Sequence, residues 1–84
     1  MERSVLIGVD VGTTNCKAVA YSRDGTKIIE RSVEYPTYHP KPLWAEQDPN
    51  DWVKAFIKST REVIAYLKKR GYIVKAICTT SQRE

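Results

Sequence analysis

The densest group of reactive side chains lies in a short segment near the start of the chain. It combines a carboxylate, a glycine turn, hydroxyls, an amide and a cation, in the order Asp10, Gly12, Thr13, Thr14, Asn15 and Lys17. Gly12 allows a tight turn and a close approach of the backbone to a ligand. The N–H groups and hydroxyls that follow can surround an anion, and the carboxylate can organise a hydrated cation beside it. These residue types suit a polyphosphate that carries Mg²⁺.

The same segment has a plain structural interpretation as well. It is not a P-loop, because Gly-Lys-Ser/Thr is absent and a strand pattern, not a helix pattern, follows the turn. An Asx-type hairpin turn would use the same residues without any ligand. The motif alone does not separate this turn from an anion cradle.

An antiparallel meander is expected to carry this segment. Residues 4–11 form a near-continuous apolar run, which is typical of a strand covered on both faces. Residues 16–22 resume an extended, alternating pattern. Asp24-Gly25 predicts a hairpin turn because both residues tolerate positive φ, and residues 27–35 follow as a third strand. We therefore predict a three-stranded meander over residues 4–35.

A helix and a fourth strand are expected after a proline-rich loop at residues 36–48. Asp48 as N-cap and Pro49 at the first helical position predict a helix over residues 49–70, which Gly71 can end in the left-handed conformation. Residues 72–78 then form a strand, and residues 79–84 form a loop. The apolar stripe of the helix is expected to contain Trp52, Phe56, Ile57, Val63, Ile64 and Leu67.

This order of elements predicts an α/β fold with a mixed sheet ordered 3-2-1-4 and one crossover helix. A right-handed crossover places the fourth strand parallel to the first, on the side away from its hairpin partner. The first strand is apolar on both faces, whereas one helix covers one face. Because a complete soluble domain rarely leaves such a face open, we expect residues 1–84 to be an incomplete portion of a larger domain.

Composition and charge argue against nucleic-acid-binding, membrane-spanning and secreted proteins. The 84 residues hold 14 Lys and Arg against 10 Asp and Glu, a net charge of +4. Many of the cations fall on the expected helix and its C-terminal end, which indicates a solvated helix face and no nucleic-acid partner. Neither a membrane-spanning run nor a signal pattern is present, so we expect a cytoplasmic chain without a membrane partner. Cys16 and Cys78 are expected to be two buried free thiols.

Four segments resemble the FGGY carbohydrate kinases, which include glycerol kinase and xylulose kinase. Asp10-x-Gly12-Thr13-Thr14 in a first hairpin is similar to the first phosphate motif of the actin, hexokinase and heat-shock ATPase superfamily. The Asp24-Gly25 turn, W-A-E-Q-D-P-N-D-W at 44–52 and I-C-T-T-S-Q-R-E at 77–84 narrow the resemblance to the FGGY family. The resemblance spans residues 5–84. It implies the N-terminal part of an actin-like ATPase (ribonuclease H-like) domain.

The resemblance also implies cofactors and residue roles. ATP and Mg²⁺ would be the cofactors, with Asp10 organising the metal through water. Lys17 stands where glycerol kinases carry Arg and would face the transferring phosphoryl group. The residues implied to bind the ATP phosphates are Gly12, Thr13, Thr14, Asn15 and Lys17, and those implied to bind substrate are Gln82, Arg83 and Glu84.

The implied reaction is transfer of the γ-phosphoryl group of ATP to a hydroxyl of a polyol or ketose. Gln82-Arg83-Glu84 favours glycerol or a related small polyol, whereas W-A-E-Q-D-P is closer to the pentulose-kinase form, so the substrate stays open between the two. The family's catalytic carboxylate base comes from a much later segment, so these 84 residues alone are expected to be inactive and to need the remainder of the kinase chain. The competing hypothesis is a stand-alone interaction module that self-associates through its exposed sheet.

Overall fold

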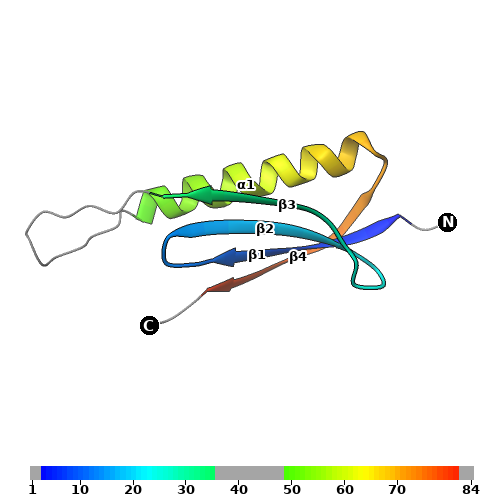
Figure 1. Ribbon diagram of the computed structural model, residues 1–84. Coiled ribbons are helices and arrows are strands. Elements are labelled where there is room, and N and C mark those ends of the chain that lie inside the picture. Colours follow the sequence, from blue (N-terminus) through cyan, green and yellow to red (C-terminus); the bar gives the residue numbers. More distant parts are fainter. Residues whose placement is uncertain (1–2, 36–48, 82–84) are drawn as a thin grey trace, which may run out of the picture.

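The computed structural model describes residues 3–35 and 49–81, which form four strands and one helix (Figure 1). The elements are β1 (Ser4–Val11), β2 (Asn15–Ser22), β3 (Lys27–Glu34), α1 (Pro49–Lys69) and β4 (Ile73–Ser81). The expected loop at residues 36–48 and the last expected loop residues, 82–84, lie outside the described ranges.

The strands form one mixed sheet in the order β3-β2-β1-β4. β1 pairs antiparallel with β2 and parallel with β4, and β2 pairs antiparallel with β3. The parallel pair is joined by α1, which crosses one face of the sheet above β2 and β3 (Figure 1). The expected fold class, strand order and crossover helix are therefore confirmed.

The hydrophobic core lies between α1 and the sheet. Alternate residues of β1 and β2 point into it, because successive side chains of a strand lie on opposite faces. The core members with at most 2% exposure are Val5, Ile7, Val9, Cys16, Ala18, Ala20, Ala55, Val63 and Leu67. Within β2, Cys16, Ala18 and Ala20 lie on the core side, as the alternating pattern of residues 16–22 predicts.

The buried side of α1 contains smaller side chains than expected. Ile57 is 45% exposed, whereas Ala55, Ser59 and Thr60 are buried. Small side chains let the helix axis come close to the sheet, while Ile57, two positions from both Ala55 and Ser59, points outward. Ser59 is buried at little cost because its hydroxyl donates to the Ala55 carbonyl at 2.8 Å. The prediction that Ile57 lies on the core stripe was wrong, and Trp52 of the same predicted stripe is 39% exposed.

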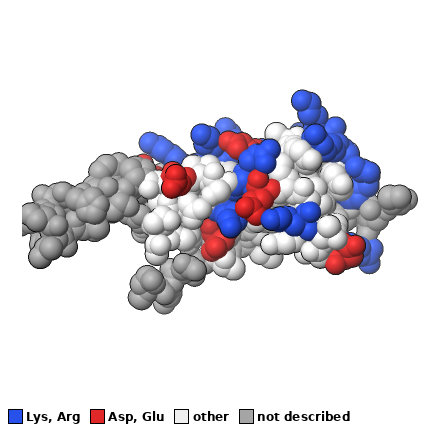
Figure 2. Space-filling model, in the orientation of Figure 1, with Lys and Arg blue, Asp and Glu red and all other residues white. Residues whose placement is uncertain are grey.

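The C-terminal end of α1 forms a Schellman cap. Gly71 has φ of 78°, as expected, and its N–H donates to the Lys68 carbonyl at 3.2 Å. Tyr72 N–H donates to the Leu67 carbonyl at 3.0 Å, which completes the paired bonds of this motif. Lys and Arg gather at this end of the helix, at the right of Figure 2, where cations complement the helix dipole.

Two other element ends differ from expectation. In the β2–β3 turn only Gly25 takes positive φ, at 89°, while Asp24 does not. The Gly25 N–H donates to the Ser22 carbonyl at 3.0 Å, so the hairpin is a wider turn that ends in a glycine bulge. β4 also continues past Cys78 to Ser81, because its last residues pair with β1 as far as Val11.

The sheet face opposite α1 is covered by no element within the described ranges, and we call it the open face. Leu6 on this face is 48% exposed. Cys78 pairs with Gly8 across β1 and β4 and is exposed, so the prediction that both thiols are buried was wrong for Cys78. Cys16 faces the helix, and burial raises the pKa of its thiol.

Within the described ranges α1 is the one helix, and its sequence is not apolar enough to cross a membrane.

Candidate functional site

The chemistry-bearing residues converge on the open face, at the end of the sheet where β1 meets β2. Asp10 and Lys17 are directly opposite partners in the β1–β2 register. They share a hollow of about 560 Å³ with residues of β1, β2 and β4, lined by Gly8, Val9, Asp10, Lys17, Val19, Tyr21, Cys78 and Thr80. The sequence motif therefore becomes one side of a concave surface.

The loop between β1 and β2 is closed tightly by its own backbone. Gly12 N–H donates to the Asn15 carbonyl at 2.9 Å, which leaves Thr13 and Thr14 exposed at the tip. A Cβ atom at Gly12 would lie 3.3 Å from the Asn15 carbonyl oxygen. Gly12 is thus favoured by the close approach of the backbone and not by positive φ.

Tyr35, just after β3, braces this loop from the core side. Its hydroxyl donates to the carbonyl of Gly12 and, at 2.9 Å, to that of Asn15. Its backbone N–H donates to the Thr14 carbonyl at 3.1 Å. Burial raises the pKa of the Tyr35 phenol. Strand alternation puts this ring on the same face as Ile29 and Val33, but nothing in the sequence indicated that its hydroxyl would reach the loop.

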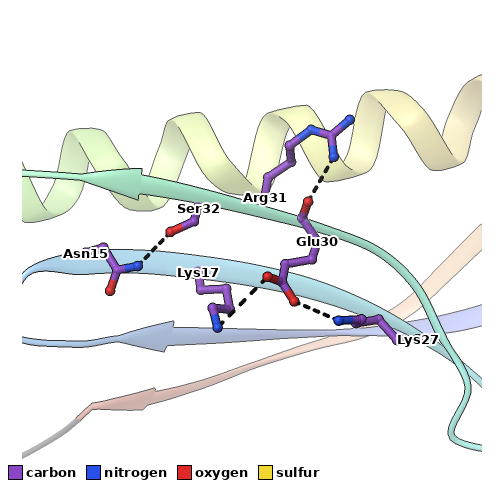
Figure 3. A network of polar contacts seen from close by, with 6 residues as sticks. All are labelled: Asn15, Lys17, Lys27, Glu30, Arg31 and Ser32. Carbon is purple, nitrogen blue, oxygen red and sulfur yellow. Dashed lines mark hydrogen bonds and ion pairs between the residues drawn. The ribbon is translucent and has the colours of Figure 1, made fainter.

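Asn15 and Lys17 both interact with β3 on the open face (Figure 3). The Asn15 side chain donates from Nδ2 to Ser32 Oγ at 2.6 Å. Lys17 Nζ lies 3.9 Å from Glu30 Oε2, while Lys27 Nζ lies 3.1 Å from the other oxygen of that carboxylate. The hydrogen bond and charge of Lys27, and then the charge of Lys17, lower the pKa of Glu30.

Asp10 is exposed and accepts a hydrogen bond from Thr80 Oγ1 at 3.3 Å. Its exposure removes the desolvation cost that a carboxylate at the end of a buried strand would carry. Within the described residues, no group of at least three His, Cys, Asp or Glu side chains could hold a metal ion directly. One exposed carboxylate suits an ion that keeps most of its water ligands, as Mg²⁺ does.

The described residues thus bring together Asp10, Lys17 and the loop from Gly12 to Asn15. Gln82, Arg83 and Glu84, the residues expected to bind substrate, lie outside the described ranges. The strand that leads to them, β4, pairs its last residue, Ser81, with Val11. Thr80, beside Asp10, is a polar neighbour of the site that sequence reasoning missed, because residues 79–81 were expected to form a loop.

Comparisons with known proteins identify the family of the chain. Residues 5–84 match the model of the FGGY family of carbohydrate kinases, N-terminal domain. The chain is 38% identical over 81 residues to glycerol kinase of Aquifex aeolicus, which covers 96% of this chain and 16% of that protein. It is 34% identical over 82 residues to xylulose kinase of Staphylococcus epidermidis, covering 98% of this chain and 16% of that protein.

Solved structures show the same arrangement of elements. The chain superposes on Plasmodium falciparum glycerol kinase with a TM-score of 0.90 at 26% identity, over 99% of this chain and 17% of that one. For xylulose kinase from Lactobacillus acidophilus the TM-score is 0.80 at 32% identity, over 94% of this chain and 16% of that one. The chain therefore spans about one-sixth of the length of these relatives. The match of the family model over residues 5–84 shows that the chain belongs to the FGGY family of carbohydrate kinases.

Proposed function

We propose that this chain supplies the first phosphate-binding loop and part of the substrate site of an ATP-dependent kinase. The complete enzyme would transfer the γ-phosphoryl group to a hydroxyl of a polyol or ketose. The observation that carries this proposal is the placement of Asp10 and Lys17 in one hollow beside the β1–β2 loop. A cation, a carboxylate and a turn of backbone amides are the groups that bind the phosphates of a nucleotide with Mg²⁺.

The loop residues would bind the nucleotide phosphates. Thr13 and Thr14 are exposed at the tip, where their N–H groups and hydroxyls would face phosphate oxygens, while Gly12 allows the close approach. Asn15 would act through its backbone, because its side-chain amide already donates to Ser32. The structure of P. falciparum glycerol kinase was determined with ADP, which supports a nucleotide as the ligand here.

Lys17 would neutralise charge on the transferring phosphoryl group. Its ammonium acts as a point charge and lacks the bidentate fork of the arginine implied for glycerol kinases. Bound Mg²⁺ would supply further charge neutralisation at the phosphates. Asp10 fits the role of accepting hydrogen bonds from the water ligands of that ion, because it is a single exposed carboxylate within the hollow.

The substrate and the catalytic base involve residues beyond the described ranges. Gln82, Arg83 and Glu84 would bind the hydroxyls of the substrate, since a guanidinium and a carboxylate together supply a donor and an acceptor. Both glycerol kinase and xylulose kinase are among the similar proteins, which supports either a polyol or a ketose. The base would come from the remainder of a longer kinase chain in the cytoplasm, so the 84 residues alone would be inactive.

The test is an assay of the complete kinase with ATP and Mg²⁺ against a panel of polyols and ketoses. We expect Lys17→Ala to lower kcat by about 100-fold or more, because it removes charge stabilisation of the transition state, and Lys17→Arg to retain much of the activity. Lys58→Ala, on the exposed side of α1, is the matched control. Full activity of Lys17→Ala, or no turnover of any alcohol by the wild type, would overturn the proposal.

A stand-alone interaction module is the second candidate, and exposed apolar residues favour it. Leu6, Ile73 and Ile77 are 48%, 56% and 45% exposed, and β4 is an edge strand of the described sheet. Edge strands of this kind pair with other chains. If the module hypothesis holds, sedimentation of the 84-residue chain will show concentration-dependent dimers that Ile77→Lys abolishes. A monomer at every concentration would exclude self-association.

A further inference from the structure

Tyr35 engages the β1–β2 loop through both its backbone and its side chain. Its N–H donates to the Thr14 carbonyl at 3.1 Å. Its hydroxyl proton is shared between the carbonyl oxygens of Gly12 and Asn15, the second at 2.9 Å. Tyr35 lies at least 20 positions along the chain from these two acceptors. It thus bonds to the carbonyl groups of Gly12, Thr14 and Asn15 in the loop.

The loop needs such a contact because its own sequence does not favour its shape. The Gly12–Asn15 hydrogen bond leaves only Thr13 and Thr14 at the tip. Tips of two residues favour mirror-image turns, which require positive φ. Neither threonine adopts positive φ, as β-branched residues rarely do. The tip therefore lacks the positive-φ residues of the favoured two-residue turns, and contacts from outside the loop help to hold it.

The direction of these contacts matters for an anion. The carbonyls of Gly12, Thr14 and Asn15 all accept hydrogen bonds from Tyr35, so these oxygens are directed at Tyr35. A carbonyl oxygen that faced the phosphate would repel it, whereas an N–H group would attract it. By holding these acceptors, Tyr35 keeps their oxygens from facing a phosphate.

The surroundings of Tyr35 keep it in place and protonated. The residue is 6% exposed, and its ring centroid lies 6.5 Å from that of Trp52 in the first turn of α1. Burial, followed by the nearby Cys16 and Asp10, raises the pKa of the phenol. The hydroxyl therefore remains a hydrogen-bond donor throughout the pH range in which a kinase works.

We propose that Tyr35 is a positioning residue for nucleotide phosphates, whose hydroxyl holds the loop from Gly12 to Asn15 in its binding shape. This inference rests on the proposed function and goes beyond it, because it names a residue outside the phosphate loop. It concerns the nucleotide, because the hydrogen bonds of Tyr35 within the described ranges go to the loop that is proposed to bind the phosphates.

The test compares Tyr35→Phe with the wild type in the complete kinase. Phenylalanine keeps the ring beside Trp52 and removes only the hydroxyl. We expect KM for ATP to rise by about fivefold to tenfold, as for the loss of a buried hydrogen bond, with KM for the alcohol substrate unchanged. Hydrogen exchange of the Gly12 amide, measured by NMR on the same proteins, should become faster by a similar factor. Tyr66→Phe, whose ring stacks on Arg70, should change none of these values.

The outcomes separate this inference from the proposed function. An unchanged KM for ATP in an active Tyr35→Phe enzyme would overturn the positioning role, as would equal rises in both KM values. If the wild type transfers no phosphoryl group, the proposed function fails. Hydrogen exchange then decides the loop-holding role of Tyr35, and an unchanged Gly12 exchange rate would overturn that role too.

Discussion

Lys17 Nζ lies 3.9 Å from Glu30 Oε2 across β2 and β3 (Figure 3). The carboxylate of Glu30 thus competes with any phosphate for the cation that is proposed to face the phosphoryl group. Lys17 is 43% exposed, so the pair is weakened by water and releases the lysine easily. Lys27 lies 3.1 Å from the same carboxylate. It favours the ionised form of Glu30 and offsets part of its negative charge.

Glu30→Gln should strengthen nucleotide binding by the complete kinase. The change removes a negative charge from the neighbourhood of the phosphates and leaves Lys17 without its competing partner. We expect KM for ATP to fall by about twofold to fivefold at low salt, the range of an exposed ion pair, and by less at high salt. Glu62→Gln, which breaks a 3.8 Å pair with Arg31 on the helix side, should have no such effect. A higher KM for ATP in Glu30→Gln would contradict the competition.

Gly12→Ala should destabilise the loop, whereas Gly8→Ala should be tolerated. A Cβ atom at Gly12 would lie 3.3 Å from the backbone oxygen of Asn15, and one at Gly8 would lie 3.8 Å from the edge of the Tyr21 ring. Only the first contact forces the backbone apart. We expect Gly12→Ala to lower the free energy of unfolding by about 1 kcal/mol and Gly8→Ala to change it by less than about 0.5 kcal/mol. Urea unfolding of both variants measures the difference, and equal effects would contradict the close approach at Gly12.

Asp24 should make folding sensitive to acid. Hydrogen bonds from the Ser22 hydroxyl and then from Thr26 lower the pKa of its carboxyl. The folded state therefore prefers the charged form. Its contribution to stability is present above the unfolded pKa of about 3.9 and is lost as the pH falls through the lower folded value.

An NMR titration of the Asp24 carboxyl carbon checks this prediction. The wild type should titrate below the ordinary range of aspartate, and Ser22→Ala should raise the pKa toward it. Unfolding of Asp24→Asn should depend less steeply on pH between about pH 4 and pH 2 than unfolding of the wild type. An ordinary Asp24 pKa in the wild type would show that the turn hydrogen bonds do not favour the charged form.

Much of the fold could be predicted because local patterns and topology rules agree. The apolar run at 4–11, the Asp24-Gly25 pair and the cap at Gly71 each determine an element or an end, and the crossover rule then leaves one strand order. Errors arose where tertiary packing decides. Ile57 and Ser59 both fit an amphipathic helix, and only the distance between helix and sheet decides which is buried. Cys78 lies in its predicted strand but is exposed, because that strand is at the edge of the described sheet and the thiol lies on the open face.

The candidate site was predictable in its residues and less so in its contacts. Asp10, Lys17 and the turn between them are close in sequence, so any hairpin brings them together. The contacts of Tyr35, Thr80 and Glu30 with the site join segments distant in the chain, and no local pattern encodes them. Their geometry depends on the register of the three strand pairs. Alternation in the sequence predicts the face on which a residue lies, but not its partner on the next strand.

Arg3 is expected to stabilise the opposite end of the sheet by joining it to the end of α1. Its Nη2 donates to the Arg70 carbonyl at 2.7 Å, and its guanidinium lies 4.4 Å from the centroid of the Tyr72 ring. The carbonyl thus satisfied is one that a helix end leaves without an intrahelical partner. Arg3→Ala should lower the free energy of unfolding by about 1 kcal/mol, through loss of the hydrogen bond and the cation–π contact.

The Lys variant distinguishes geometry from charge at this position. Arg3→Lys keeps the positive charge but not the planar group that stacks on Tyr72 while donating to Arg70, so it should recover less than half of the lost stability. Lys69→Ala removes a cation from the last turn of the same helix and should change stability by less than about 0.5 kcal/mol. Urea unfolding of the three variants measures these differences. Full recovery in Arg3→Lys would mean that charge near the helix end, rather than the shape of the guanidinium, provides the stabilisation.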